Sequence, residues 1–66
     1  MTEAEAILAA RAEADRLGWR WLEPAAADRE GSAWVVRSNV HARGMNIRIR
    51  LDDRTGGILE RVLNPR

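Results

Sequence analysis

The sequence predicts an α+β fold in which an N-terminal helix packs on an antiparallel meander sheet of three or four strands. Residues 1–17 are rich in alanine, glutamate, arginine and leucine, all of which favour helix. From residue 32 onward, apolar and polar residues alternate between turn-forming glycines, as in strands with one buried face. Because 66 residues are too few for two domains, we expect residues 1–66 to form a single small unit.

The helix is expected over residues 2–17. Thr2 and Glu5 form a capping box, in which each side chain accepts a hydrogen bond from the other's backbone amide. Gly18 predicts the end of the helix, because glycine readily adopts the left-handed conformation that follows a helix. The helix is therefore bounded by a recognisable signal at each end.

One broad side of this helix is mostly alanine, which lets a helix lie close to a sheet. At 100° per residue, that side comprises Ala4, Ala6, Ile7, Leu8, Ala10, Ala14 and Leu17. Arg11 falls on the same side. We expect its guanidinium to extend to the rim of the core and to pair with Asp15 one turn later.

Trp19 and Trp21 follow the helix, and their side chains point to the same side if the segment is extended. Such a pair either closes one end of a small core, with the ring nitrogens directed outward, or forms a stacking platform for a ligand. We interpret the two indoles as core residues, and we retain them as a candidate partner surface.

Strands are expected over residues 32–40, 45–52 and 57–63, with a further short edge strand over 25–29. The middle strand has the clearest pattern, since its isoleucines and leucine alternate with arginine and aspartate. That alternation predicts one buried and one solvent-facing side. The alanines of residues 25–29 favour helix, so the prediction of a strand there depends on the residues that flank them.

Two turns separate these strands. His41–Gly44 is expected to form a loop in which Gly44 adopts a positive φ. Residues 53–56 have the sequence Asp-Arg-Thr-Gly of a type I turn, in which we expect Asp53 to accept hydrogen bonds from the turn amides. Gly56 then closes the turn in the left-handed region.

The composition argues against an enzyme. The chain has no cysteine and one histidine, His41, so neither a thiolate metal site nor a histidine cluster is expected. No nucleophile elbow or phosphate-binding loop is present in the sequence. Asp52 and Asp53 could suggest a cation site, but the twelve-residue calcium loop is missing. We therefore expect no catalytic residue, no metal and no cofactor.

The charge pattern leaves one candidate binding surface. The eleven arginines and ten acidic residues nearly balance, and no lysine is present. Arg48 and Arg50 fall on the solvent side of the middle strand, with Arg37 on its neighbour and Arg43 in the loop between them. These arginines either pair with acids across the strands or bind phosphates or carboxylates. We favour the paired arrangement, because no aromatic residues are interleaved for nucleic-acid stacking.

The pattern resembles a single PepSY-type unit. A helix is followed by Trp34-Val35-Val36, a strand of alternating apolar residues, and the D-x-x-T-G hairpin within Leu51–Leu59. The resemblance implies an α+β fold and a non-catalytic inhibitory or regulatory module. It carries over no site residue, because the matching positions have structural roles.

We expect a cytoplasmic protein, because the N-terminus lacks the basic and apolar segments of a signal peptide and no apolar run could span a membrane. We also expect a homodimer. Ile58 and Val62 should lie on one side of the last strand, with Leu59 and Leu63 on the other. A strand that is apolar on both sides of so small a domain suggests that one side contacts a partner. The function predicted is therefore an interaction module, with nucleic-acid or anion binding as the alternative.

Overall fold

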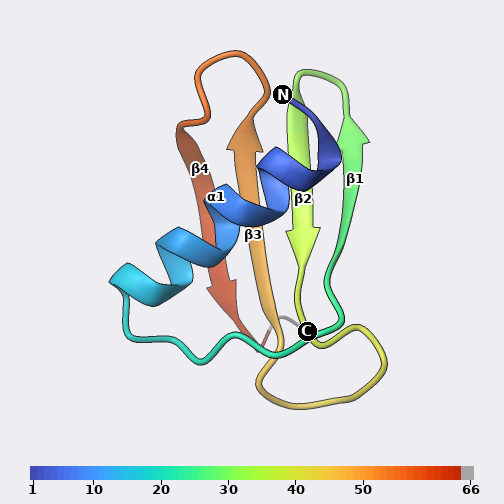
Figure 1. The fold of residues 1–66 in the computed structure, drawn as a ribbon, viewed down its shortest axis with the longest axis vertical. Helices are drawn as coiled ribbons and strands as arrows, with labels where there is room; N and C mark the ends of the chain where they lie inside the picture. Colours follow the sequence, from blue (N-terminus) through green and yellow to red (C-terminus); the bar gives the residue numbers. More distant parts are fainter. Residues whose placement is uncertain (65–66) are drawn as a thin grey trace.

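A computed structural model describes residues 1–64 and contains one helix and four strands within that range, as drawn in Figure 1. In chain order these elements are α1 (Glu3–Arg16), β1 (Ala26–Glu30), β2 (Ala33–Arg37), β3 (Ile47–Asp52) and β4 (Ile58–Leu63). The strands pair in sequence order as an antiparallel meander, and α1 crosses one face of the sheet obliquely. The predicted α+β architecture is confirmed, with four strands.

The helix begins and ends through the predicted signals. The Thr2 hydroxyl accepts a hydrogen bond from the Glu5 amide at 3.1 Å, and the Glu5 carboxylate accepts one from the Thr2 amide at 2.7 Å. At the other end, Gly18 adopts φ 74° and Trp19 donates its amide to the Ala14 carbonyl at 2.8 Å. The helix is one residue shorter at each end than expected, because the terminal residues are caps.

The buried side of α1 is narrower than the predicted one. Ala6, Ala10 and Ala14 are fully buried against the sheet, whereas Leu8 is 68% exposed. Ala4 and Arg11 are also exposed. The contact is centred on the alanine line, so residues near the edge of the predicted side face solvent. The predicted placement of Ala4, Leu8 and Arg11 on the buried side was therefore wrong.

Arg11 also has a different partner from the one expected. Its guanidinium lies 3.8 Å from the carboxylate of Glu23, on the segment after the helix, and forms no ion pair with Asp15 within the described residues. Both side chains of this pair are more than 60% exposed. Arg11 therefore does not reach the rim of the core, and its position on the solvent side of α1 explains why.

The strands are shorter than predicted wherever the backbone turns. β2 ends at Arg37 because Asn39 adopts a positive φ of 53°, and β3 begins at Ile47 because Gly44 and Met45 have φ values of 92° and 55°. The expected positive φ at Gly44 is confirmed. The short strand expected over 25–29 is present as β1, shifted by one residue.

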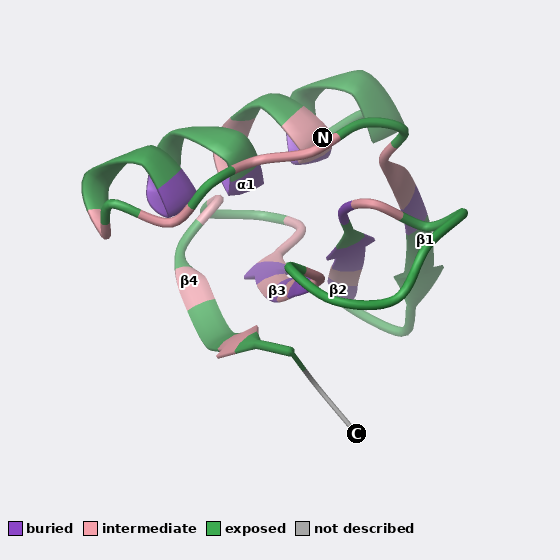
Figure 2. Ribbon diagram, turned by 90° about the horizontal axis from the view of Figure 1, so that it is seen from below, coloured by how far each residue is buried: buried purple, intermediate pink, exposed green. Residues whose placement is uncertain are grey.

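The alternation in the middle strand decides which side of the sheet is covered. Ile47, Ile49 and Leu51 are buried beneath α1, together with Ala27 of β1 and Val36 of β2. Figure 2 shows the buried residues of the helix and of the central strands facing one another. The other side, which we call the open face, has no element packed on it among the described residues.

The last strand contains a bulge that changes its predicted orientation. Glu60 pairs with Arg50 and Ile58 pairs with Leu51, which leaves Leu59 as an extra residue. Ile58 therefore lies on the helix side with Leu63, while Val62 lies on the open face opposite Arg48. The predicted placement of Ile58 and Val62 on one side of the strand was wrong, because a simple alternation cannot anticipate an inserted residue.

No helix within residues 1–64 is long and apolar enough to cross a membrane.

Candidate interaction surfaces

Three of the four predicted arginines come together on the open face. Arg37, Arg48 and Arg50 line a shallow hollow with a volume of about 310 Å³, together with Val35 and two glutamates. The register explains this, since Arg37 lies directly opposite Arg48. Arg43 does not line the hollow: it is exposed in the loop between β2 and β3.

Acidic residues neutralise most of this arginine cluster. Arg37 bonds to Asp28 at 2.8 Å and lies 4.0 Å from Glu30, while Arg48 lies 3.5 Å from Glu60. These contacts cross from strand to strand, as in the paired arrangement favoured from the sequence. Exposed pairs of this kind each contribute little stability, but they occupy the guanidinium groups.

Arg50 differs from its neighbours on the open face. It forms no ion pair within the described residues, and its Nε atom is buried without a hydrogen-bond partner there. The strand register nevertheless places Glu60 directly opposite Arg50.

The open face as a whole carries three arginines and four acidic residues, namely Arg37, Arg48, Arg50, Asp28, Glu30, Asp52 and Glu60. It has no excess of positive charge.

The neighbouring aspartates have roles different from the predicted ones. Asp52, not Asp53, accepts hydrogen bonds from the turn amides, from Arg54 at 2.8 Å and from Thr55 at 3.0 Å. These amides hold the pKa of Asp52 below its usual value. Gly56 closes the turn at φ 73°, as expected. The assignment of the cap to Asp53 was wrong by one residue, because the turn begins at the last residue of β3.

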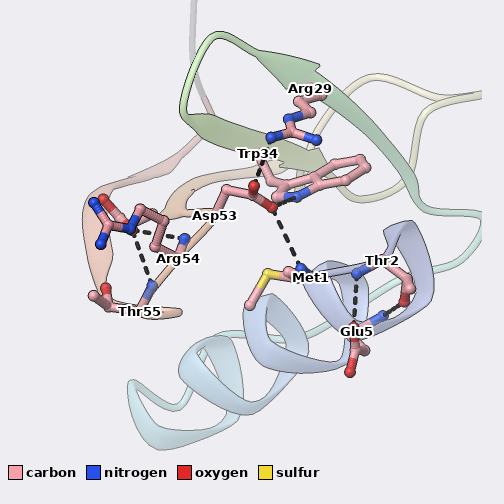
Figure 3. A network of polar contacts seen from close by, with 9 residues as sticks. Met1, Thr2, Glu5, Arg29, Trp34, Asp53, Arg54 and Thr55 are labelled. Atoms are coloured by element: carbon pink, nitrogen blue, oxygen red, sulfur yellow. Dashed lines mark hydrogen bonds and ion pairs between the residues drawn. The ribbon is translucent and has the colours of Figure 1, made fainter.

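Asp53 instead joins three segments on the helix side of the sheet, as Figure 3 shows. Its carboxylate accepts a hydrogen bond from Trp34 Nε1 at 2.6 Å and one from Arg29 at 2.7 Å. The amino group of Met1 lies 3.6 Å away. The Trp34 hydrogen bond, assisted by the charge of Arg29, lowers the pKa of Asp53 against the opposing effect of burial. No local sequence signal indicates this cluster.

Trp34 therefore lies on the opposite side of the sheet from the open-face arginines. It faces the helix side, where it packs partly against the core. No indole interleaves with Arg37, Arg48 or Arg50, which removes the stacking component of a nucleic-acid surface.

Trp19 and Trp21 combine the two roles considered from the sequence. Both rings are partly buried and pack against the core, and both also line a groove beside α1. The ring nitrogens do not both point outward as expected. Trp21 Nε1 is buried, with no hydrogen-bond partner among the described residues. The Trp21 ring packs against the core on one side and lines the groove on the other, and the edge that carries its N–H group is buried.

Leu59 and Leu63 belong to β4, at the edge of the sheet, and neither lines the groove. Leu59 is 56% exposed and Leu63 is 37% exposed. Within residues 1–64, α1 lies against β1, β2 and β3 but makes no comparable backbone contact with β4. The candidate partner surface thus divides into two separate parts, a groove beside the helix and an apolar edge strand.

Glu13 is a buried carboxylate that the sequence pattern did not single out. It accepts two hydrogen bonds from Arg16, at 2.8 and 2.6 Å, and lies 3.7 Å from Arg61 of β4. The Arg16 hydrogen bond lowers the pKa of Glu13 despite its burial. This ion-pair cluster links the end of α1 to the edge strand.

Asn46 organises the loop between β2 and β3. Its amide nitrogen donates to the carbonyls of Asn39 at 2.9 Å and Ala42 at 3.1 Å, and its amide oxygen accepts from Gly44 at 2.9 Å. His41 is exposed in the same loop. The arrangement accounts for the loop conformation without a ligand.

Within the part of the chain that the structure describes, no three His, Cys, Asp or Glu side chains are grouped to hold a metal ion. Comparison with known proteins finds no matching family model, no matching curated protein and no matching solved structure. The two parts of the partner surface are therefore the features from which a function is inferred.

Proposed function

We propose that this protein is a non-enzymatic interaction module that pairs with a second copy of itself along β4. The observation that supports this is the difference between the two edges of the sheet. β1 exposes Asp28, Arg29 and Glu30 in succession, whereas four of the six residues of β4 are aliphatic. Charged edge strands resist pairing with another chain, and apolar ones favour it.

Within residues 1–64, no further strand pairs with the outer side of β4, so its outward backbone groups are open to a partner. Asn64 donates its amide to the Asn46 carbonyl at 2.6 Å, and antiparallel residues alternate between facing the partner strand and facing away. By that alternation, Glu60 and Val62 face β3, while the N–H and C=O groups of Arg61 and Leu63 face outward. A further strand can bond to these outward groups without disturbing the sheet.

A two-fold axis through Val62 gives the most favourable pairing. Two antiparallel β4 strands would then place Val62 against Val62 on the open face and Arg61 beside Leu63 of the second copy on the helix side. Shifting the pairing by one register step sets Arg61 against Arg61 in one direction, and a second step that way sets Glu60 against Glu60. Like charges directly opposite are destabilising in a sheet. One step in the other direction sets Leu63 against Leu63, which pairs β4 through its last residue alone. Closed two-fold dimers are also the commonest oligomers.

Light scattering after size exclusion, at several concentrations, measures the assembly. We expect a mass of twice 7.4 kDa at high micromolar concentration. Leu59→Asp should shift the protein toward monomer, because it places a charge on the edge strand. Leu8→Asp is the matched control, since Leu8 is comparably exposed but lies on the helix. A wild-type mass of one chain would contradict the proposal.

The predicted axis has its own test. Val62→Asp should abolish the dimer, because two carboxylates would face each other across the axis, whereas Val62→Thr keeps the shape and should leave the dimer intact. If Leu59→Asp dissociates the dimer but Val62→Asp does not, the edge strand is the interface and the register is wrong. Circular dichroism of each variant checks that the fold is retained.

The alternative function is binding of a nucleic acid or another anion at the open face. The observation in its favour is that Arg50 forms no ion pair within residues 1–64. Against it, acids outnumber arginines on that face. Retention on a polyanion column at physiological salt, lost in Arg48→Glu with Arg50→Glu, would support the alternative; an unretained wild type would exclude it. Phosphate binding weakens steeply with salt, whereas the edge-strand dimer should persist.

The resemblance to a PepSY-type unit agrees with a non-catalytic role, and none of the comparisons bears on it. The proposal therefore rests on β4 itself.

A further inference from the structure

A groove beside α1 is separate from the proposed dimer edge. It lies between the later turns of the helix and the segment that follows it, and it has a volume of about 490 Å³. We propose that this groove binds a peptide segment of a protein partner that carries both aliphatic and acidic residues. None of the residues that line it belongs to β4, so this inference does not depend on the dimer.

Each wall of the groove carries apolar side chains beside charged ones. Trp19 and Trp21 form one wall and are supported from behind by the core. Leu8 and Ala12 belong to the other wall, and Leu8, at 68% exposed, has no packing role in the core. The volume is within the range of about 300–1,000 Å³ that is usual for ligand sites. An aliphatic side chain seated here would cover exposed apolar surface on both walls.

The segment after α1, which forms one wall of the groove, is held by hydrogen bonds at both ends, so the groove is already formed before a ligand binds. Trp19 donates its amide to the Ala14 carbonyl at 2.8 Å, which joins the segment to the helix. The far end accepts hydrogen bonds from the loop between β2 and β3, at the Leu22 carbonyl from Asn39 and at the Pro24 carbonyl from Val40. A site that needs no ordering on binding loses less free energy to entropy.

The polar groups of the groove favour an acidic ligand. Arg11 and Arg20 both line it, against the single carboxylate of Asp15. Arg20 forms no ion pair within the described residues, and the pair of Arg11 with Glu23 is long and exposed, so a ligand carboxylate can replace it. Guanidinium groups bind carboxylates through two parallel hydrogen bonds. The exposed Leu8 and Ala12 of the same groove offer contact to an aliphatic side chain, which a peptide carries and a nucleic acid lacks.

The indole N–H groups allow a direct test by nuclear magnetic resonance on the full chain. The probe is a blocked peptide of alternating leucine and glutamate, and its control is the same peptide with lysine in place of glutamate. We expect the glutamate peptide to shift the Nε1–H signals of Trp19 and Trp21 saturably. The signal of Trp34 should stay in place, because that group is bonded to Asp53. The lysine peptide should give no saturable shift.

Charge reversal separates a specific groove from general attraction. Arg11→Glu with Arg20→Glu should weaken peptide binding about tenfold or more, because it removes both cationic partners. Arg43→Glu with Arg54→Glu changes the net charge equally at exposed positions outside the groove and should leave the affinity within about twofold. Equal weakening in both double variants, equal binding of both peptides, or a shift of Trp34 alone would overturn the proposal.

Two variants distinguish failure of the groove proposal from failure of the dimer proposal. Leu8→Asp should weaken binding of the glutamate peptide while leaving the mass in solution unchanged. Leu59→Asp should have the reverse effect. A peptide affinity that falls in Leu59→Asp and is unchanged in Leu8→Asp would place the binding site on β4 and contradict the groove.

Discussion

Trp34 Nε1 donates a 2.6 Å hydrogen bond to the carboxylate of Asp53, across 19 positions of the chain. This bond joins β2 to the turn that follows β3, and Arg29 adds a bond from β1 to the same carboxylate. The backbone amide of Asp53 also donates to the Ser32 carbonyl at 2.9 Å. One side chain thus holds together the end of the sheet that lies beneath the start of α1 (Figure 3).

Asp53→Asn tests this arrangement. Asparagine has nearly the same shape, but it removes the negative charge shared by Trp34, Arg29 and the amino group of Met1. We expect a lower midpoint of urea denaturation than in the wild type. Asp28→Asn is the matched control, because Asp28 is exposed and pairs only at the surface. A similar small loss in both variants would show that the cluster does not contribute specifically.

Acid should destabilise the protein through the same carboxylate. The Trp34 hydrogen bond and the charge of Arg29 hold the pKa of Asp53 in the folded state below its unfolded value of about 4. The stabilisation is therefore present above pH ~4 and is lost as the pH falls through the lower, folded-state pKa. Asp52 and Glu13 shift in the same direction and should add to the effect.

Urea denaturation at pH 7, 4 and 2.5 measures this dependence. The midpoint should fall most steeply at the acid end, and Asp53→Asn should show a shallower fall than the wild type. Equal slopes in the two proteins would mean that Asp53 is not one of the titrating groups.

The two sides of β3 should respond very differently to truncation. Ile49→Ala removes a fully buried side chain and should cost about 2–5 kcal/mol of unfolding free energy. Arg48→Ala should cost less than about 1 kcal/mol, because its pair with Glu60 is on the open face. Thermal unfolding followed by circular dichroism compares them. Two equal melting temperatures would contradict the observed alternation.

The alanine line of α1 should not tolerate larger residues. Ala10 is fully buried against the sheet, so Ala10→Leu should destabilise the fold by about 1–3 kcal/mol through overpacking. Leu8→Ala, on the solvent side of the same helix, should change stability by no more than about 0.5 kcal/mol. Chemical denaturation of both variants checks this. A neutral Ala10→Leu would mean that the helix can move away from the sheet at little cost.

Features set by local backbone chemistry could be read from the sequence. The capping box of Thr2 and Glu5 and the left-handed Gly18 depend on residues within one turn of each other, and both are present in the structure. The alternation of β3 is equally local, because side chains on a strand point to opposite sides in turn. These signals were sufficient to predict the helix, the strands and their meander order.

Features that depend on contacts between distant segments could not be read in this way. Asp52 and Asp53 illustrate the difference. The cap of the turn by Asp52 is local, since it reaches amides two and three residues later, and the sequence predicted such a cap one residue too late. The role of Asp53 depends on distant segments, and only the tertiary structure assigned that role. It placed Asp53 beneath the helix, within reach of Trp34. A shift of one residue reverses the side of the sheet that a strand residue faces.

The candidate surfaces follow the same division. The sequence alone determined that arginines, tryptophans and leucines were available, at positions consistent with exposed strands and a loop. Tertiary structure decided their use: cross-strand acids neutralise Arg37 and Arg48, and the bulge at Leu59 turns Ile58 toward the helix side. The physical reason is that periodicity follows from each strand's own backbone, whereas pairing, bulges and coverage by α1 arise only when separate elements meet.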